Sequence, residues 1–154
     1  MNIRKYRPED CNEVFELFYN TVHTVNLKDY SREQVDAWAP GDVDARQWGK
    51  SRLRHYSIVA EQDGVITGFG DIDDGGYLSM LYVHKDHQGI GVATAILDEL
   101  EKYAKDKNAK EITTHASITS RPVFEKRGYA VVSEQTVERK GQRLTNYHMT
   151  KIFS

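Results

Sequence analysis

The chain has a single cysteine and no long run of apolar residues, and both scarcities exclude whole classes of protein. One thiol, Cys11, can form neither an internal disulfide nor a cysteine-rich zinc site, and it is compatible with a reducing compartment. No stretch reaches the roughly 18 apolar residues of a membrane-spanning helix, and the charged start MNIRKYRPED lacks the apolar segment of a signal peptide. The sequence therefore predicts a cytoplasmic protein without a membrane partner.

An excess of one charge is also missing. Lys and Arg number 21 against 23 Asp and Glu, so the net charge is −2. No overall field attracts nucleic acid, and we expect no nucleic-acid partner. The length of 154 residues, 39 % of them hydrophobic, is about one domain's worth and supplies enough apolar material for a core. We expect a single domain over residues 1–154.

Periodicity and turn residues divide the chain into strands and helices without internal repeats. Strands are predicted at 2–7, 56–61, 65–72, 77–84 and 111–117, and residues 130–153 form a hairpin that turns at Lys140-Gly141. Helices are predicted after Pro8, over 31–38 and 42–55, after Gly91, and over 120–128. This order predicts an α+β fold whose mixed, mostly antiparallel sheet of about seven strands contains one central strand–helix–strand crossover.

The stretch HQGIGVAT (87–94) precedes a long amphipathic helix and has an unusual composition. It places glycines at 89 and 91, has no capping side chain, and is followed by no carboxylate before Asp98. The N–H groups at such a helix start, with the positive end of the helix dipole, favour an anion such as phosphate. The alternative is that the two glycines only make a tight turn. A P-loop is excluded, because no Lys-Ser/Thr pair follows them.

The segment LYVHKDHQGIGVATAILDELEKYA resembles the pyrophosphate-binding segment of the GNAT superfamily of acyl-CoA-dependent N-acetyltransferases. Gln88, Gly91 and Ala93 meet its Q/R-x-x-G-x-G/A signature. IRKYRPED resembles the first strand and helix start of that family, and SRPVFEKRGY resembles its late strand–helix segment. SREQVDAWAP and TNYHMTK are most similar to the YafP-like branch of bacterial acetyltransferases.

The resemblance implies that the fourth and fifth strands splay and that acetyl-CoA, as cosubstrate, lies between them. Its pantetheine arm is expected along Leu81, Tyr82 and Val83, with the Leu81 amide as the donor that polarises the thioester carbonyl. Ser117 and Phe124 take the cofactor-side positions that often hold Asn and Tyr, so the usual general acid is absent. The pyrophosphate is expected on the N–H groups of Gln88, Gly89, Ile90, Gly91, Val92, Ala93 and Thr94.

The acceptor side is less defined. Asp71 and His115 are candidate bases for the proton of the amine, although an Asp near a strand end or a lone His also occurs in purely structural positions. His23, Tyr30 and Trp38 lie in the helical excursion between the first two strands and are candidates to bind the substrate. The alternative for the tryptophans of this excursion is packing against the sheet. His84 and His87 have no further ligands at metal-site spacing, and we expect no metal.

The sequence thus predicts direct transfer of an acetyl group from acetyl-CoA to a primary amine in a ternary complex. The acceptor is a small-molecule amine or a peptide or protein amine, and the resemblance also allows a homodimer. The alternative is a catalytically silent domain that binds or senses acyl-CoA, which the missing general acid favours.

Overall fold

Seven strands form one sheet in the order β1-β2-β3-β4-β5-β7-β6 in the computed structural model, which describes residues 1–153. Ser154, the last residue of the expected domain, lies outside the described residues. Every neighbouring pair is antiparallel except β4 and β5, which confirms the mixed sheet with one central crossover. The strands are β1 (Asn2–Lys5), β2 (Tyr56–Gln62), β3 (Val65–Ile72), β4 (Tyr77–Val83), β5 (Glu111–Ser117), β6 (Ala130–Arg139) and β7 (Gln142–Ile152).

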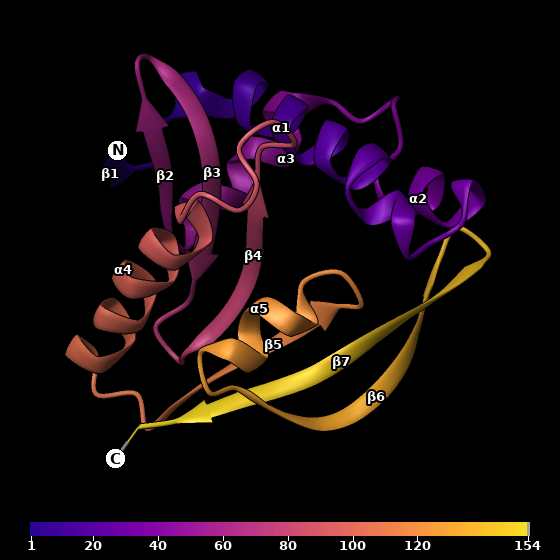
Figure 1. Ribbon diagram of the computed structural model, residues 1–154. Helices are drawn as coiled ribbons and strands as arrows, with labels where there is room; N and C mark the ends of the chain where they lie inside the picture. The colour runs from indigo at the N-terminus through magenta and orange to yellow at the C-terminus, as the bar shows by residue number, and fades with distance from the viewer. Residues whose placement is uncertain (154) are drawn as a thin grey trace.

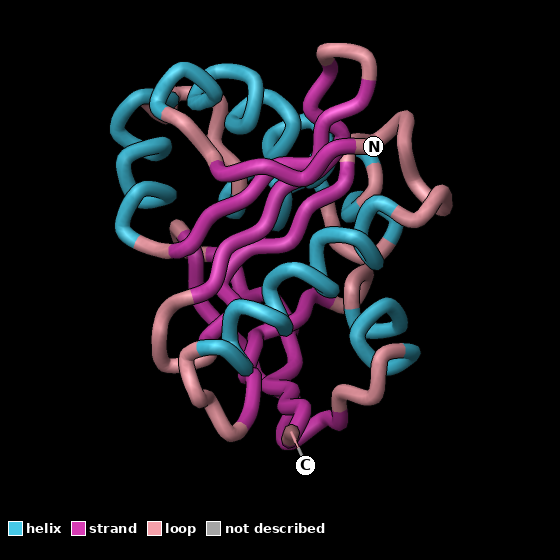
Figure 2. Tube along the Cα trace, turned by 90° about the vertical axis from the view of Figure 1, so that its left-hand side faces the viewer, coloured by secondary structure: helices cyan, strands magenta, loops and turns pink. Residues whose placement is uncertain are grey.

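Helices cover both faces of the sheet (Figure 2). One face carries the short turns η1 (Pro8–Asp10), η2 (Asn26–Lys28) and η3 (Ser51–Arg54) with α1 (Cys11–Thr24), α2 (Arg32–Trp38) and α3 (Ala45–Lys50). The other face carries α4 (Val92–Asp106) and α5 (Arg121–Lys126). No helix within residues 1–153 is long and apolar enough to cross a membrane.

Two predicted elements are shorter than expected. The helix predicted over 42–55 begins only at Ala45, because the Asp44 carboxylate accepts the Arg46 N–H at 2.9 Å and so caps α3. After Lys50 the chain tightens into η3. The strand predicted over 2–7 ends at Lys5, because the Arg7 N–H turns to the Asp10 carboxylate at 2.8 Å.

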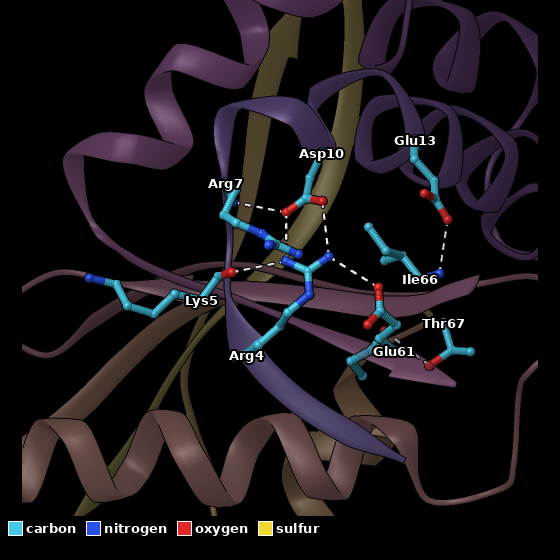
Figure 3. A network of polar contacts seen from close by, with 9 residues as sticks. Arg4, Lys5, Arg7, Asp10, Glu13, Glu61, Ile66 and Thr67 are labelled. Carbon is cyan, nitrogen blue, oxygen red and sulfur yellow. Dashed lines mark hydrogen bonds and ion pairs between the residues drawn. The ribbon is translucent and has the colours of Figure 1, made fainter. Parts of the chain in front are cut away.

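A polar network fixes the start of the chain against the sheet (Figure 3). Arg4 of β1 donates to both carboxylate oxygens of Asp10, at 2.9 and 3.0 Å, and to Glu61 of β2 at 3.1 Å. Burial opposes the ionisation of Asp10, but the hydrogen bonds from Arg4 and the Arg7 N–H outweigh it and hold the pKa of Asp10 below its usual value. The network joins β1, β2 and the start of α1.

Two glycines of β3 bring α4 onto the centre of the sheet. A Cβ at Gly68 would lie 2.7 Å from Cγ1 of Val92, and one at Gly70 would lie 2.9 Å from Cγ2 of Ile96. Only residues without a side chain allow this approach. The first turn of α4 therefore lies directly beside β3 and the end of β4.

The sheet opens between β4 and β5. The two strands pair only where Tyr77 meets Thr113 and Leu78 meets Thr114, with Thr114 Oγ1 donating to the Leu78 carbonyl at 2.8 Å. Beyond Leu78 no pairing between them is present in the described residues, and Figure 1 shows β1–β4 and β5–β7 diverging as two groups. The expected splay of the fourth and fifth strands is confirmed.

Candidate functional site

A cavity of about 430 Å³ lies where β4 and β5 separate, and it extends from α4 and α5 on one face to the end of α1 and α2 on the other. Its wall includes most of the expected site residues: Trp38, Leu81, Tyr82, Val83, Gln88, Gly89, Gly91, Val92, Ala93, Thr94, His115, Ser117 and Phe124. Four expected residues are not in the wall: His23, Tyr30, Asp71 and Ile90.

The start of α4 is open to this cavity. Gly89 and Gly91 have φ of +74° and +91°, and a Cβ at either would meet nothing within 4 Å. No side chain in the described part of the chain caps the helix, and its first turn contains no acid. The N–H groups of Val92, Ala93 and Thr94 have no hydrogen-bond acceptor within residues 1–153. The positive end of the helix dipole thus faces empty space with its donors unused.

The loop before α4 is held by its own side chains. Gln88 Nε2 donates to the Val83 carbonyl at 2.7 Å, and the Asp86 N–H donates to His84 Nδ1 at 3.0 Å. Thr21 Oγ1 of α1 donates to the same Val83 carbonyl at 3.0 Å. The Gln88 side chain therefore fastens the loop to β4, which leaves the backbone of the loop to face a ligand.

Leu81 presents its backbone to the gap between the strands. The His84 N–H bonds to Thr67 of β3 at 2.8 Å, whereas the Val83 carbonyl points away from β3 toward Gln88 and Thr21. Backbone groups alternate sides along a strand, so the Leu81 N–H lies on the same side as the Val83 carbonyl. Since the ladder with β5 ends at Leu78, this N–H faces the cavity.

His115 lies in the wall across the gap, on β5. Its Nδ1 is 3.2 Å from the Tyr77 hydroxyl, and its ring centroid is 5.5 Å from that of His148 on β7. Burial lowers the pKa of His115, and the neighbouring His148 lowers it further. The imidazole is therefore neutral near pH 7 and able to accept a proton.

Asp71 lies behind the wall. Its side chain has no exposed surface, its Oδ1 accepts a hydrogen bond from Ser79, and its Oδ2 is 3.3 Å from Arg52 Nη1. Burial raises the pKa of Asp71 and outweighs the opposing effects of Arg52 and Ser79. Ser79 itself lines the cavity, so it separates the expected base from a substrate.

The three candidate acceptor residues have different surroundings. Trp38, at the end of α2, is half-buried in the wall with its ring edge-on to Tyr30, 5.2 Å between centroids. Tyr30 has a structural role, because its hydroxyl donates to the Thr145 carbonyl at 2.6 Å and accepts from the Ile118 N–H at 2.9 Å. His23, on α1, forms a hydrogen bond from Nε2 to the Ala39 carbonyl at 2.8 Å. Trp48 instead stacks on Phe18, 5.2 Å between centroids.

The cofactor-side positions on β5 and α5 hold no tyrosine. Ser117 Oγ donates to the Ser120 hydroxyl and accepts from the Ser120 N–H, each at 3.0 Å. Phe124 is buried, with its ring centroid 5.1 Å from that of Tyr129. The Tyr129 hydroxyl donates to Glu101 at 3.0 Å, away from the cavity wall. Among residues 1–153, Tyr82 is the one tyrosine of the wall, and its ring packs on Phe69.

Sequence reasoning missed several wall residues. Thr21, Val25 and Asn26 belong to an ordinary amphipathic helix and the turn after it, and nothing in the sequence separates them from its other positions. Lys126 ends the late helix and Arg127 follows it, and these two adjacent basic residues were a usable signal. The remaining ones are Leu78, Ser79, Thr114, Thr119, Ser120 and Val123.

No group of three or more His, Cys, Asp or Glu side chains within residues 1–153 is arranged to hold a metal ion.

Comparison with known proteins agrees with this geometry. The family model described as acetyltransferase (GNAT) domain matches residues 26–151. The chain belongs to the GNAT acetyltransferase family. It is 33 % identical over 150 residues to the uncharacterized N-acetyltransferase YafP of Escherichia coli, which covers 97 % of this chain and 94 % of that protein. This confirms the similarity to the YafP-like branch.

Solved structures show the same fold. A GCN5-related N-acetyltransferase, named aminotransferase class-II, from Rhodopseudomonas palustris is 34 % identical with a TM-score of 0.95, over 99 % of this chain and 95 % of that one. YncA of Salmonella typhimurium, solved with its cofactor acetyl-CoA, is 20 % identical with a TM-score of 0.72, over 100 % of this chain and 94 % of that one.

Proposed function

We propose that this GNAT protein transfers an acetyl group from acetyl-CoA to a primary amine by direct attack within a ternary complex. The observation that carries the proposal is the uncapped start of α4, whose N–H groups have no acceptor within residues 1–153 and open onto the same cavity as the Leu81 N–H. Anion binding at one end of the cavity and a polarising donor at the other are what a CoA thioester needs.

The chain contributes distinct groups to the two substrates. The N–H groups of Gly91, Val92 and Ala93, and the open space over Gly89, fit a pyrophosphate, while the edge of β4 fits an extended amide-containing arm. The Leu81 N–H donates to the thioester carbonyl and stabilises the negative charge that develops there. YncA, a fold relative, binds acetyl-CoA.

The acceptor amine enters from the side of α1 and α2. Trp38 offers a half-buried aromatic surface there, and His115 offers a neutral imidazole with its Nδ1 turned to Tyr77. No tyrosine stands at the Phe124 position, so the thiolate leaves without a dedicated donor. A thiol of pKa about 8.5 is a tolerable leaving group under these conditions.

The test is a release assay for free CoA thiol with acetyl-CoA and a panel of amines: an amino acid, a polyamine, an aminoglycoside and a peptide with a free N-terminus. Mass spectrometry of the acceptor must show one added acetyl group. Tight CoA binding with no acetylation of any amine would contradict the proposal and favour the silent acyl-CoA-binding domain.

A further inference from the structure

Ser79 reaches the cavity from an irregular position in β4. In the register of β3 with β4, Asp71 pairs with Met80 and Ile72 pairs with Leu78, so Ser79 is an extra, unpaired residue. Such a β-bulge re-aims a side chain that regular alternation would point elsewhere. Here the hydroxyl of Ser79 lies in the cavity wall and donates to the carboxylate of Asp71 on the neighbouring strand.

The carboxylate behind Ser79 is incompletely satisfied. Asp71 has no exposed surface, and Arg52, 7 % exposed, approaches it only to 3.3 Å. Asp71 Oδ2 and the Nε and Nη1 atoms of Arg52 are buried without a hydrogen-bond partner among residues 1–153. A buried ion pair contributes little net stability, because the cost of removing both charges from water offsets their attraction. Ser79 therefore connects the cavity to a buried carboxylate that is available to change its protonation state.

We propose, as an extension of the acetyltransferase function proposed above, that Ser79 contacts the acceptor amine and passes its proton to Asp71. Ser79 is then a catalytic residue, because its oxygen touches the reacting nitrogen. Asp71 and Arg52 act through it and are positioning residues.

The proton transfer accompanies the attack. The lone pair of the amine nitrogen forms the new C–N bond, and the C–S bond of the thioester breaks with its electron pair moving to sulfur. One N–H proton of the amine moves to Ser79 Oγ while the hydroxyl proton of Ser79 moves to Asp71 Oδ1. The products are the amide, the CoA thiolate and a neutral Asp71. The proton then returns from Asp71 through the Ser79 hydroxyl to water in the cavity, and from there to the thiolate or to solvent.

The groups around Asp71 suit a carboxylate that gains and loses a proton. Burial disfavours the ionised carboxylate. Arg52 and His55, from η3 and the residue after it, and the Met80 N–H of β4 favour it. The hydroxyls of Tyr77 and Tyr82 on β4 also feel its charge. His115 on β5 stands across the gap, where it contacts Tyr77 instead. The net effect raises the pKa of Asp71, which brings its protonation closer to neutral pH.

Steady-state kinetics of the protein, with the amine that it acetylates fastest, test the proton transfer through Ser79 to Asp71. Ser79→Ala should lower kcat about a hundredfold, the usual size of a general-base contribution, while the KM for acetyl-CoA stays unchanged. Ser79→Thr keeps the hydroxyl and should restore most of the rate. The wild-type kcat should fall at acidic pH as Asp71 becomes protonated, and Asp71→Asn should remove this acidic limb. His115→Gln should retain it.

A second measurement does not depend on turnover. The ¹³C carboxyl resonance of Asp71, assigned by sequential backbone connectivity in the wild type, should shift when propylamine is added to the wild type but not to Ser79→Ala. Ser79→Ala keeps the Asp71–Arg52 pair, so it serves if Asp71→Asn fails to fold.

The outcomes separate the two proposals. Full kcat in Ser79→Ala, or an acidic limb that disappears in His115→Gln and persists in Asp71→Asn, would overturn the proton route and leave the acetyltransferase function standing. An Asp71 shift with propylamine but no acetylation of any amine would support the Ser79 contact and overturn the function. No shift in the wild type would overturn the contact.

Discussion

Two helices of this protein lead to the cavity, and they begin in opposite ways. At the start of α2, Ser31 Oγ accepts the Gln34 N–H at 3.1 Å and Gln34 Oε1 accepts the Ser31 N–H at 2.8 Å. At the start of α4, no side chain takes that role. The helix α2 brings Trp38 to the wall by its far end, whereas α4 presents its own start. In α2, which contributes a side chain to the cavity, the chain's own side chains satisfy the first N–H groups. In α4, which contributes its backbone, the first N–H groups are left without a side-chain acceptor.

The largest expected effect comes from placing a negative charge at the uncapped start of α4. Thr94→Glu places a carboxylate in the first turn of α4, where the dipole favours it and should slightly raise the melting temperature. The same charge repels a pyrophosphate, at about 1–4 kcal/mol for each close pair of charges, so the Kd for CoA should rise about a hundredfold. Calorimetric titration measures it. Thr94→Gln, the uncharged control, should bind nearly as the wild type does, and equal affinity in both variants would refute the phosphate site.

The next effect concerns the other end of α2. Trp38→Ala should raise the KM for the amine about tenfold and leave acetyl-CoA affinity unchanged, because it removes binding surface on the acceptor side alone. Trp48→Ala is the matched control, since that ring packs between Phe15 and Phe18. It should lower the melting temperature more than Trp38→Ala and leave the amine KM of the folded protein intact. The reverse pattern would assign the acceptor pocket elsewhere.

A smaller effect is expected from opening the closed helix start. Ser31→Ala removes the capping box of α2 and should cost about 1 kcal/mol of unfolding free energy. Denaturant unfolding measures it. Because α2 is capped for stability rather than for ligand binding, the Kd for CoA should not change, and a large change would argue that the two helix starts do not have separate roles.

The smallest effect concerns Asp10, whose carboxylate accepts hydrogen bonds from Arg4 and from the Arg7 N–H just before α1. The pKa of Asp10 is lower in the folded protein than in the unfolded chain. Its contribution to stability is therefore full above about pH 3.9, the unfolded value, and is lost as the pH falls through the folded value. Asp10→Asn should flatten the decline in melting temperature on acidification from about pH 5 to pH 3. An equally steep decline in the variant would place the acid-sensitive groups elsewhere, with Glu101, whose pKa is also lowered, as the next candidate.

Much of the fold could be read from local patterns. The hairpin of β6 and β7 turns at Lys140 and Gly141, both with positive φ, as the sequence indicates. The glycine-rich stretch before α4 was identifiable because its chemistry is local: two glycines, no cap and no acid. The same holds for Ser31 and Gln34, which sit three residues apart and need no tertiary contact to pair.

The acceptor side could not be read in this way. Asp71 and Tyr30 looked available, but each is held by a group that lies far away in the sequence or in an irregular position. Tyr30 bonds Thr145 and Ile118, and Asp71 is covered by Ser79. The bulge at Ser79 breaks the two-residue alternation from which a strand's faces are predicted.

The sequence by itself determined the order of strands and helices and the unsatisfied start of α4, because periodicity, capping and turn chemistry act between near neighbours. Its motifs also carried the resemblance to the GNAT family. The tertiary structure alone decided which polar side chains remain free to meet a substrate. A polar group that becomes buried must find a partner, and that partner comes from whichever strand or helix the packing brings beside it. For this protein the packing uses the Tyr30 hydroxyl to join Thr145 and Ile118, and it leaves Trp38 half-buried in the cavity wall. It also sets Ser79 between the cavity and Asp71.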